Sequence, residues 1–265
     1  SFVSPKWVPQ LADARALCEA LAKDPPRPEG VNYSALVPND KGMDQALEAN
    51  QQAGRRVLDK VSVFTAASQT FSRKNTNATI EETIARFGPV VARAKAASLL
   101  VRGYVSCAIA CPFEGAIKPS AVADVSRKLA DLGVDEISLG DTIGAGTPDS
   151  VVAMLEAVRA ALADDWTRDE FRLNLHLHDT FGRAASCVVA ALDAGIRSFD
   201  GSVAGLGGCP YASTPGKRAP GNIDTSLLIR TIRERGFATG ASVDTLAEAA
   251  VFARSIVSAA RLASP

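Results

Sequence analysis

The 265-residue sequence has little histidine, no net charge and no long apolar run. Lysine plus arginine and aspartate plus glutamate number 29 each, so nothing indicates a polyanionic partner such as nucleic acid. No apolar run approaches the ~20 residues of a membrane-spanning helix. Five scattered cysteines argue against a disulfide framework and favour a reducing compartment. A Gly-x-Gly-x-x-Gly fingerprint and a Walker loop are both absent, which disfavours a nucleotide-binding open sheet.

The only two histidines lie two residues apart in one alternating segment. Leucines at 173, 175 and 177 alternate there with Asn174, His176 and His178. A period of two is typical of a β-strand, so both imidazoles project from one face, about 7 Å apart. Neutral imidazole is the commonest nitrogen ligand for metals. We interpret the pair as metal ligands; two hydrogen-bonded histidines on a half-buried strand are the alternative.

Strand-like and helix-like stretches alternate along the whole chain. Besides the histidine segment, the predicted strands cover residues 31–37, 57–67, 99–110, 135–140 and 198–204. The predicted helices cover residues 7–22, 41–53, 79–97, 119–132, 147–162, 182–194, 223–235 and 243–260. Two helix starts are marked by Thr79 with Glu82, a capping box, and by Thr147 followed by proline.

Six successive strand–helix units indicate an α/β protein with a parallel sheet. A doubly wound sheet and a (β/α)8 barrel both fit this order. A barrel closes at eight units, and the first residues, together with the helix predicted at 7–22, resemble the end of one further unit. Both layouts stay open on this count; in the barrel layout, residues 1–265 would be a single TIM-barrel catalytic domain with the first βα unit absent from the sequence given.

Polar and small residues recur where the predicted strands end, which is where barrel active sites form. Asp141 ends one strand and could take a proton or bind a metal; a turn or cap role is the alternative. Asn222 offers a hard amide oxygen suited to Mg²⁺, Mn²⁺ or Ca²⁺, or caps the next helix. Arg102, in an otherwise apolar strand, predicts a structural ion pair.

Cys209 lies in a glycine-rich stretch, Gly205-Leu-Gly-Gly-Cys209-Pro. Such a loop can move or approach a ligand closely. A thiol there could donate or accept a proton; an incidental cysteine in a turn is the alternative. The other four cysteines are interpreted as small core residues.

Five segments together resemble one known family. They are Ser1-Phe-Val-Ser-Pro-Lys-Trp-Val-Pro-Gln10, Val101-Arg-Gly-Tyr-Val-Ser-Cys107, Glu136-Ile-Ser-Leu-Gly-Asp-Thr-Ile-Gly144, His176-Leu-His-Asp-Thr180 and Ser202-Val-Ala-Gly-Leu-Gly-Gly-Cys-Pro-Tyr-Ala212. They are similar to 3-hydroxy-3-methylglutaryl-CoA (HMG-CoA) lyases over nearly the whole chain, and the last segment is the most specific.

The resemblance implies a (β/α)8 barrel with a divalent cation, Mg²⁺ or Mn²⁺, that cleaves HMG-CoA to acetyl-CoA and acetoacetate. It assigns His176, His178 and Asn222 as metal ligands. Asp141 would take part in proton transfer and Cys209 would protonate the departing enolate. The substrate-binding residues would be Tyr104, Ser138 and Thr180. An acyl-CoA substrate and a homodimer are expected, without nucleic acid or membrane partners.

Three departures from the family pattern accompany the resemblance. An Arg-Asp pair and a Glu of the family's first two strands are absent from the residues given, so we expect these residues alone to be poorly stable and to have negligible activity. The segment between Cys209 and Asn222 is longer than expected, and its Lys217 and Arg218 could reach CoA phosphates or be solvated. Ser226 replaces a family glutamate, which leaves a related acyl-CoA open as the substrate.

The sequence also fits other functions. A condensing synthase or aldolase could use the same barrel, although the glycine-rich loop with Cys209 favours a lyase. A catalytically inactive barrel is a further alternative, against which the complete set of candidate residues argues. We expect a cytoplasmic location, or a mitochondrial one in a eukaryote; targeting cannot be read from the first residues of the sequence given.

Overall fold

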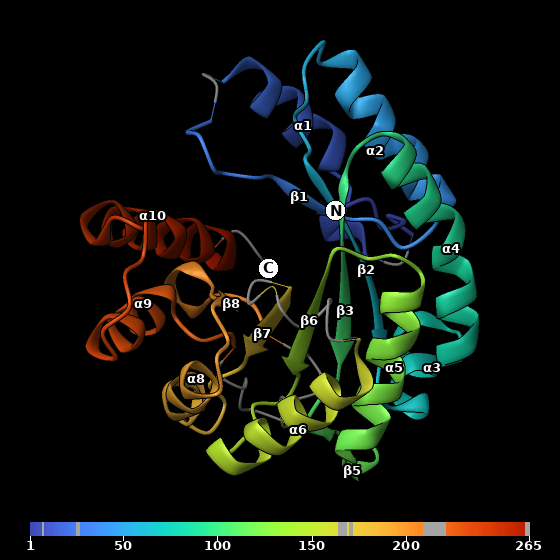
Figure 1. Cartoon of the computed structure of the whole chain (residues 1–265). Coiled ribbons are helices and arrows are strands. Elements are labelled where there is room, and N and C mark those ends of the chain that lie inside the picture. Colours follow the sequence, from blue (N-terminus) through green and yellow to red (C-terminus); the bar gives the residue numbers. More distant parts are fainter. Residues whose placement is uncertain (7, 25–26, 164–168, 170–171, 209–220, 263–265) are drawn as a thin grey trace. The chain divides into compact units, whose positions relative to one another are not determined.

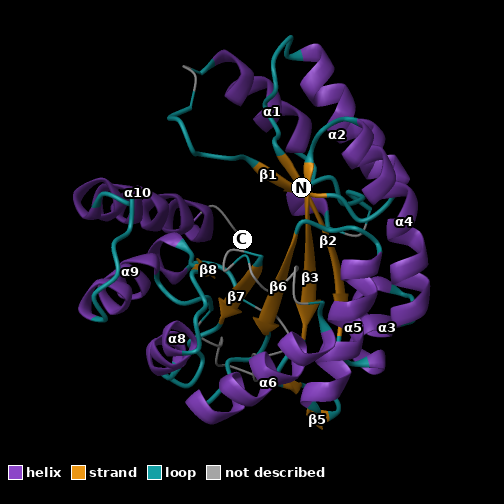
Figure 2. Cartoon of the chain, in the orientation of Figure 1, coloured by secondary structure: helices purple, strands orange, loops and turns teal. Residues whose placement is uncertain are grey.

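The computed structural model of the chain describes residues 1–262 except 7, 25–26, 164–168, 170–171 and 209–220. Helices and strands alternate along it (Figures 1 and 2). The strands are β1 (Ser34–Leu36), β2 (Lys60–Ala66), β3 (Leu100–Ser106), β4 (Ala110–Cys111), β5 (Gly115–Ala116), β6 (Glu136–Asp141), β7 (Leu173–Leu177) and β8 (Ser198–Asp200).

The helices lie mostly between these strands. They are α1 (Ala14–Lys23), α2 (Asp40–Gln52), α3 (Gln69–Thr76), α4 (Ile80–Ala96), α5 (Pro119–Asp131), α6 (Pro148–Ala161), α8 (Ala184–Asp193), α9 (Thr225–Glu234) and α10 (Val243–Leu262), with short 3₁₀ turns η1 (Pro9–Leu11) and η2 (Val203–Gly205). Within the described residues, no helix is both long enough and apolar enough to cross a bilayer.

The main sheet has the strand order β1-β2-β3-β6-β7-β8. The pairs β1–β2 and β7–β8 are parallel. The order follows the chain without reversal, whereas a doubly wound sheet reverses at a switch point. The sequential order is that of a (β/α) barrel, and the described residues supply six of its eight strands. The predicted α/β class is thus confirmed.

Contacts divide the chain into two compact units. The first comprises Ser1–Val105 and Val125–Ser138. In it, α3 and α4 pack on β2, and α2 packs between α1 and α4. The core contains Val61, Val63 and Val90, all fully buried. Phe2 donates its N–H to the carbonyl of Leu36 at 2.8 Å, so the first residues lie beside β1 as predicted.

The second unit comprises Ser106–Asp124 and Leu139–Pro265. Its helix α8 packs against both α6 and α9, and the short turn η2 contacts α9 and α10. Val151, Val188 and Ile223 are fully buried in its core. Thr147 caps α6 with its hydroxyl, which confirms that predicted helix start. The capping box of Thr79 and Glu82 in the first unit is likewise present.

Several elements differ from the sequence prediction. The strand expected over 99–110 ends at Ser106, because Cys107 has a left-handed φ of 57° and a short β4–β5 hairpin follows. The strand expected over 198–204 ends at Asp200, before η2. The first helix begins only at Ala14, after a 3₁₀ turn that contains proline. Helix α3 was not predicted.

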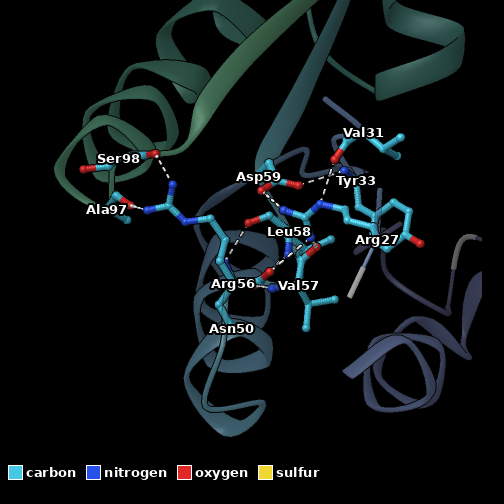
Figure 3. A network of polar contacts seen from close by, with 10 residues as sticks. All are labelled: Arg27, Val31, Tyr33, Asn50, Arg56, Val57, Leu58, Asp59, Ala97 and Ser98. Atoms are coloured by element: carbon cyan, nitrogen blue, oxygen red, sulfur yellow. Dashed lines mark hydrogen bonds and ion pairs between the residues drawn. The ribbon is translucent and has the colours of Figure 1, made fainter. Parts of the chain in front are cut away.

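Buried charges in the first unit are paired. Arg102 donates to Glu136 at 2.6 Å, which confirms the predicted ion pair, and Lys60 contacts the same carboxylate. Asp59 pairs with Arg27 and accepts the N–H of Tyr33 at 2.8 Å (Figure 3). Arg27 also donates to the carbonyl of Val31. These contacts tie the loop before β1 to the start of β2.

Removing the Asp59 charge should destabilise the chain. Arg27 and Asp59 expose only 22% and 11% of their side chains, so Asp59→Asn leaves a poorly solvated guanidinium without its carboxylate partner. We expect urea denaturation to show a loss of about 2 kcal/mol in the free energy of unfolding. The matched control is Asp193→Asn, which breaks an exposed pair with Arg235 and should cost less than about 1 kcal/mol. Equal losses would contradict a structural role for the Asp59 network.

Candidate functional site

Strand β7 carries His176, and His178 follows its last residue, Leu177, so the predicted strand forms but ends one residue before the second histidine. The three leucines of the alternating segment are buried, and so are Asn174 and His178, so both faces of the strand are covered. This is usual for a strand in a parallel sheet. The ring centroids of His176 and His178 lie 5.3 Å apart. Nδ1 of His176 lies 3.2 Å from Oδ2 of Asp200, at the end of β8. A carboxylate on one ring nitrogen orients the imidazole ring.

Asn222 lies directly beside His178. The two residues form an isolated antiparallel backbone bridge. Hydrogen bonds flank it on both sides, from the N–H of Asp179 to the carbonyl of Gly221 and from the N–H of Ile223 to the carbonyl of Leu177, both at 3.0 Å. The interpretation of Asn222 as a helix cap is wrong, because the carboxylate of Asp224 caps α9 instead.

Two facing side chains of this bridge have unsatisfied polar atoms. Among the described residues, neither Nδ1 of His178 nor Oδ1 of Asn222 has a hydrogen-bond partner, although both atoms are buried. The amide Nδ2 of Asn222 donates to the carbonyl of Leu206 at 2.9 Å, which fixes the amide orientation. Buried polar atoms are nearly always paired. An imidazole nitrogen and an amide oxygen that make no hydrogen bond are suitable ligand atoms for a divalent cation.

Burial lowers the pKa of His178 to about 4, with the neighbouring His176 contributing, while contacts with the Thr142 backbone and the Asn222 side chain act in the opposite direction. The ring is therefore neutral at physiological pH, and only neutral imidazole binds a metal. No group of three or more His, Cys, Asp or Glu side chains is arranged to hold an ion in the part of the chain described. The set His176, His178 and Asn222 fits a cation as two nitrogens and one oxygen, which leaves other positions to substrate or water.

The glycine-rich loop packs tightly against Asn222. Gly205, Gly207 and Gly208 all have positive φ angles. A Cβ on Gly207 would approach Nδ2 of Asn222 to 2.9 Å, and one on Gly221 would lie 1.5 Å from the carbonyl oxygen of Gly207. The sequence suggested a loop that moves or approaches a ligand. The structure adds that these glycines let the loop backbone reach the Asn222 amide.

Asp141 is buried at the end of β6, with 2% exposure. Its Oδ1 accepts the N–H of Ala145 at 3.0 Å and its Oδ2 accepts the N–H of Gly146 at 2.7 Å. The alternative role in a turn is therefore present in the structure, while the cap of α6 is Thr147. Burial raises the pKa of Asp141, although these amide bonds act in the opposite direction. A raised pKa favours proton uptake.

The other candidates are distributed between the units. Thr180 belongs to the second unit and packs against Gly144 of the turn after Asp141. Tyr104 and Ser138 belong to the first unit; the tyrosine hydroxyl accepts a hydrogen bond from Arg102 at 3.1 Å, and the serine is fully buried. Cys209, Lys217 and Arg218 lie outside the described residues. Cys18, Cys107, Cys111 and Cys187 are buried, as predicted.

Two residues near the site were missed in the sequence. Asp200 pairs with His176. It was missed because the predicted strand ran on to residue 204, whereas β8 ends at Asp200. Arg183 donates to the carbonyls of Ala145 and Gly146. Nothing in the local sequence distinguishes it from an ordinary residue at the start of a helix.

A sequentially ordered parallel sheet has two imidazoles at the end of β7, with the amide of Asn222 bridged to one of them. This arrangement is that of a candidate metal-dependent barrel enzyme. The HMGL-like family model matches residues 6–252. A hydroxymethylglutaryl-CoA lyase of Pseudomonas mevalonii is 47% identical over 256 residues, which cover 95% of this chain and 76% of that protein. The chain belongs to the HMGL-like family.

Solved structures agree with this assignment. The HMG-CoA lyase from Brucella melitensis is 46% identical, with a TM-score of 0.85 over 96% of this chain and 83% of that one. A second HMG-CoA lyase, from Acinetobacter baumannii in complex with coenzyme A and 3-methylmalate, is 32% identical, with a TM-score of 0.79 over 94% and 74% of the two chains. These similarities support the predicted barrel class.

Substitution of Gly221 tests the packing of the glycine-rich loop. Because a Cβ would overlap the carbonyl oxygen of Gly207, Gly221→Ala should lower the free energy of unfolding by about 3 kcal/mol and weaken cation binding at Asn222. Gly88→Ala is the control, since nothing lies within 4 Å of its Cβ in helix α4, and it should stabilise by about 0.5–1 kcal/mol. Thermal unfolding like that of the wild type in Gly221→Ala would contradict the close approach.

The buried neutral ring of His178 predicts a pH dependence of stability in the presence of chelator. Below about pH 6.5 the unfolded chain protonates this ring, whereas the folded chain does so only near pH 4. The unfolded state then binds more protons, so the free energy of unfolding falls as the pH decreases through this window. Urea denaturation at about pH 7 and pH 5 should show a smaller fall in His178→Gln. An identical fall in both proteins would refute this prediction.

Proposed function

We propose that this chain is a divalent-metal-dependent lyase that cleaves HMG-CoA to acetyl-CoA and acetoacetate. The observation that carries the proposal is the pair of unsatisfied buried atoms, Nδ1 of His178 and Oδ1 of Asn222, beside His176. The similarity to HMG-CoA lyases at 47% and 46% identity supports the substrate. We further propose that residues 1–265 belong to one catalytic barrel domain; a homodimer stays a prediction.

His176, His178 and Asn222 would hold the cation. A divalent ion such as Mg²⁺ or Mn²⁺ held there would lower the pKa of the substrate hydroxyl and help to orient the bond to be broken. Asp200 holds the ring of His176 and the carbonyl of Leu206 holds the amide of Asn222. The protein contacts behind the ligands therefore fix their orientation before any ion arrives.

Proton transfer in this proposal involves two residues. Asp141, with its raised pKa, accepts the proton of the tertiary hydroxyl as the carbon–carbon bond breaks. Cys209 on the glycine-rich loop then gives a proton to the enolate of acetyl-CoA, an assignment that rests on the family resemblance. Tyr104, Ser138 and Thr180 are proposed to contact the substrate.

A related acyl-CoA is the second candidate substrate. Ser226 stands where the family pattern has a glutamate, and it lies in the first turn of α9, its N–H bonded to the capping Asp224. The relative from Acinetobacter baumannii binds coenzyme A and 3-methylmalate, which supports a CoA ester with a branched hydroxy-acid portion as the substrate class.

The test is acetyl-CoA release from HMG-CoA by the full-length protein, with Mg²⁺ or Mn²⁺ and with chelator. We expect turnover that chelator abolishes and added metal restores. His178→Gln and Asn222→Leu should each lower kcat/KM by about 100-fold or more, because each removes one ligand. Mn²⁺ binding, measured by electron paramagnetic resonance, should weaken in both variants.

Each failure has its own meaning. Chelator-insensitive turnover would refute metal dependence. Mn²⁺ binding without turnover of HMG-CoA would favour the related acyl-CoA. No Mn²⁺ binding in the wild type would favour an inactive barrel.

A further inference from the structure

Arg183 connects two loops of the second unit. It lies at the start of α8, after the segment that follows β7. Its Nε donates to the carbonyl of Gly146 at 3.0 Å, and its NH2 group donates to the carbonyl of Ala145 at 3.1 Å. The guanidinium also lies over the ring of Phe181, 5.2 Å from its centroid. Both acceptors belong to the turn that follows Asp141 on β6.

One peptide group joins Arg183 to Asp141. The carbonyl of Ala145 and the N–H of Gly146 belong to the same peptide unit. Its oxygen accepts from Arg183 at 3.1 Å, and its N–H donates to Oδ2 of Asp141 at 2.7 Å. Hydrogen bonds in series polarise one another, and a guanidinium on the oxygen strengthens the N–H as a donor to the carboxylate. Arg183 thus acts on Asp141 without contacting it.

The turn itself offers little room for another arrangement. A Cβ on Gly146 would lie 2.7 Å from Oδ2 of Asp141, and a Cβ on Gly144 would lie 2.8 Å from the Thr180 side chain. Gly144 has a φ of 69°. Glycines lose the most conformational freedom on folding. A turn that contains two of them therefore needs contacts with other segments to hold it in one conformation. Arg183 provides two of these contacts.

We propose that Arg183 is a positioning residue for the lyase reaction, which fixes the Ala145–Gly146 peptide so that its amides hold the Asp141 carboxylate in a reactive orientation. The proposal rests on the proposed function. The Asp141 carboxylate is the group that moves when the contact is lost. A displacement on the order of 1 Å at a reacting group can cost about 100-fold in rate.

The test compares Arg183→Met, Arg183→Lys and Arg197→Met in the full-length protein. Arg197 is a matched control, since it too donates to two backbone carbonyls and lies over a phenylalanine ring, that of Phe237. Two measurements are made on each variant. One is hydrogen–deuterium exchange of the peptide covering residues 142–147, and the other is kcat and KM for HMG-CoA cleavage.

In Arg183→Met we expect exchange at the Ala145 and Gly146 amides to accelerate by about tenfold or more. We also expect kcat to fall about 10- to 100-fold, with KM changed less than about threefold. Arg183→Lys keeps one donor and the charge and should recover part of both effects. Arg197→Met should leave the exchange of this segment and the kcat unchanged. If Arg183→Met does not fold, Phe181→Leu replaces it, with smaller effects in the same direction.

Several results would overturn the proposal. Unchanged exchange would show that the turn does not depend on Arg183. Faster exchange with unchanged kcat would show that the turn does not position the reactive carboxylate. A rise confined to KM would assign Arg183 to substrate binding, and equal losses in Arg197→Met would assign the effect to general stability. A wild type that does not cleave HMG-CoA refutes the proposed function, and with it a positioning role in that reaction; exchange then decides separately whether Arg183 holds the turn.

Discussion

The backbone bridge between His178 and Asn222 is the constraint on which the site depends. Hydrogen bonds on either side hold the two residues in register, so their side chains are brought together before any ligand is present. The bridge leaves Nδ1 of His178 and Oδ1 of Asn222 buried without protein partners. Each such atom costs about 1–3 kcal/mol of folding free energy. The bridge holds two such atoms beside a second imidazole, and a bound cation would offset their unfavourable contribution to the folding free energy.

The surroundings of the bridge supply orientation without supplying further ligands. Asp200 holds one imidazole and the carbonyl of Leu206 holds the amide of Asn222. The glycine-rich loop can make the second contact only because Gly207 and Gly221 lack side chains at a close backbone approach. Contacts behind the ligands commonly tune a metal site as strongly as the ligands themselves. In this chain, much of that support comes from backbone groups.

The sequence predicted the elements that carry the site but only part of its contacts. The alternation around His176 and His178 predicted β7, and the rule that active residues follow strand ends selected Asp141. Asn222 was selected because its amide oxygen is a hard ligand. All three signals are local in the sequence. Which atoms lack partners and which residue pairs with His176 depend on segments distant in the sequence, so local spacing could not show them. Helix α3 was not predicted for a similar reason. It is rich in polar residues, and its Phe71 and Ser72 are buried in the folded chain, where the helix packs on β2. Helix propensity alone does not predict it.

Asp141 and Asp200 show how tertiary context separates residues with the same local signal. Both are carboxylates at the carboxyl ends of parallel strands. Asp200 faces an imidazole, whereas Asp141 is buried and faces two backbone amides. For Asp141, burial raises the pKa, the backbone amides and the positive charge of Arg183 lower it, and burial prevails. Any movement of the turn that lengthens the amide bonds would raise the pKa further. The proton affinity of Asp141 therefore depends on its burial and on the geometry of a glycine-containing turn, and Arg183 can influence it both through that turn and through its own charge.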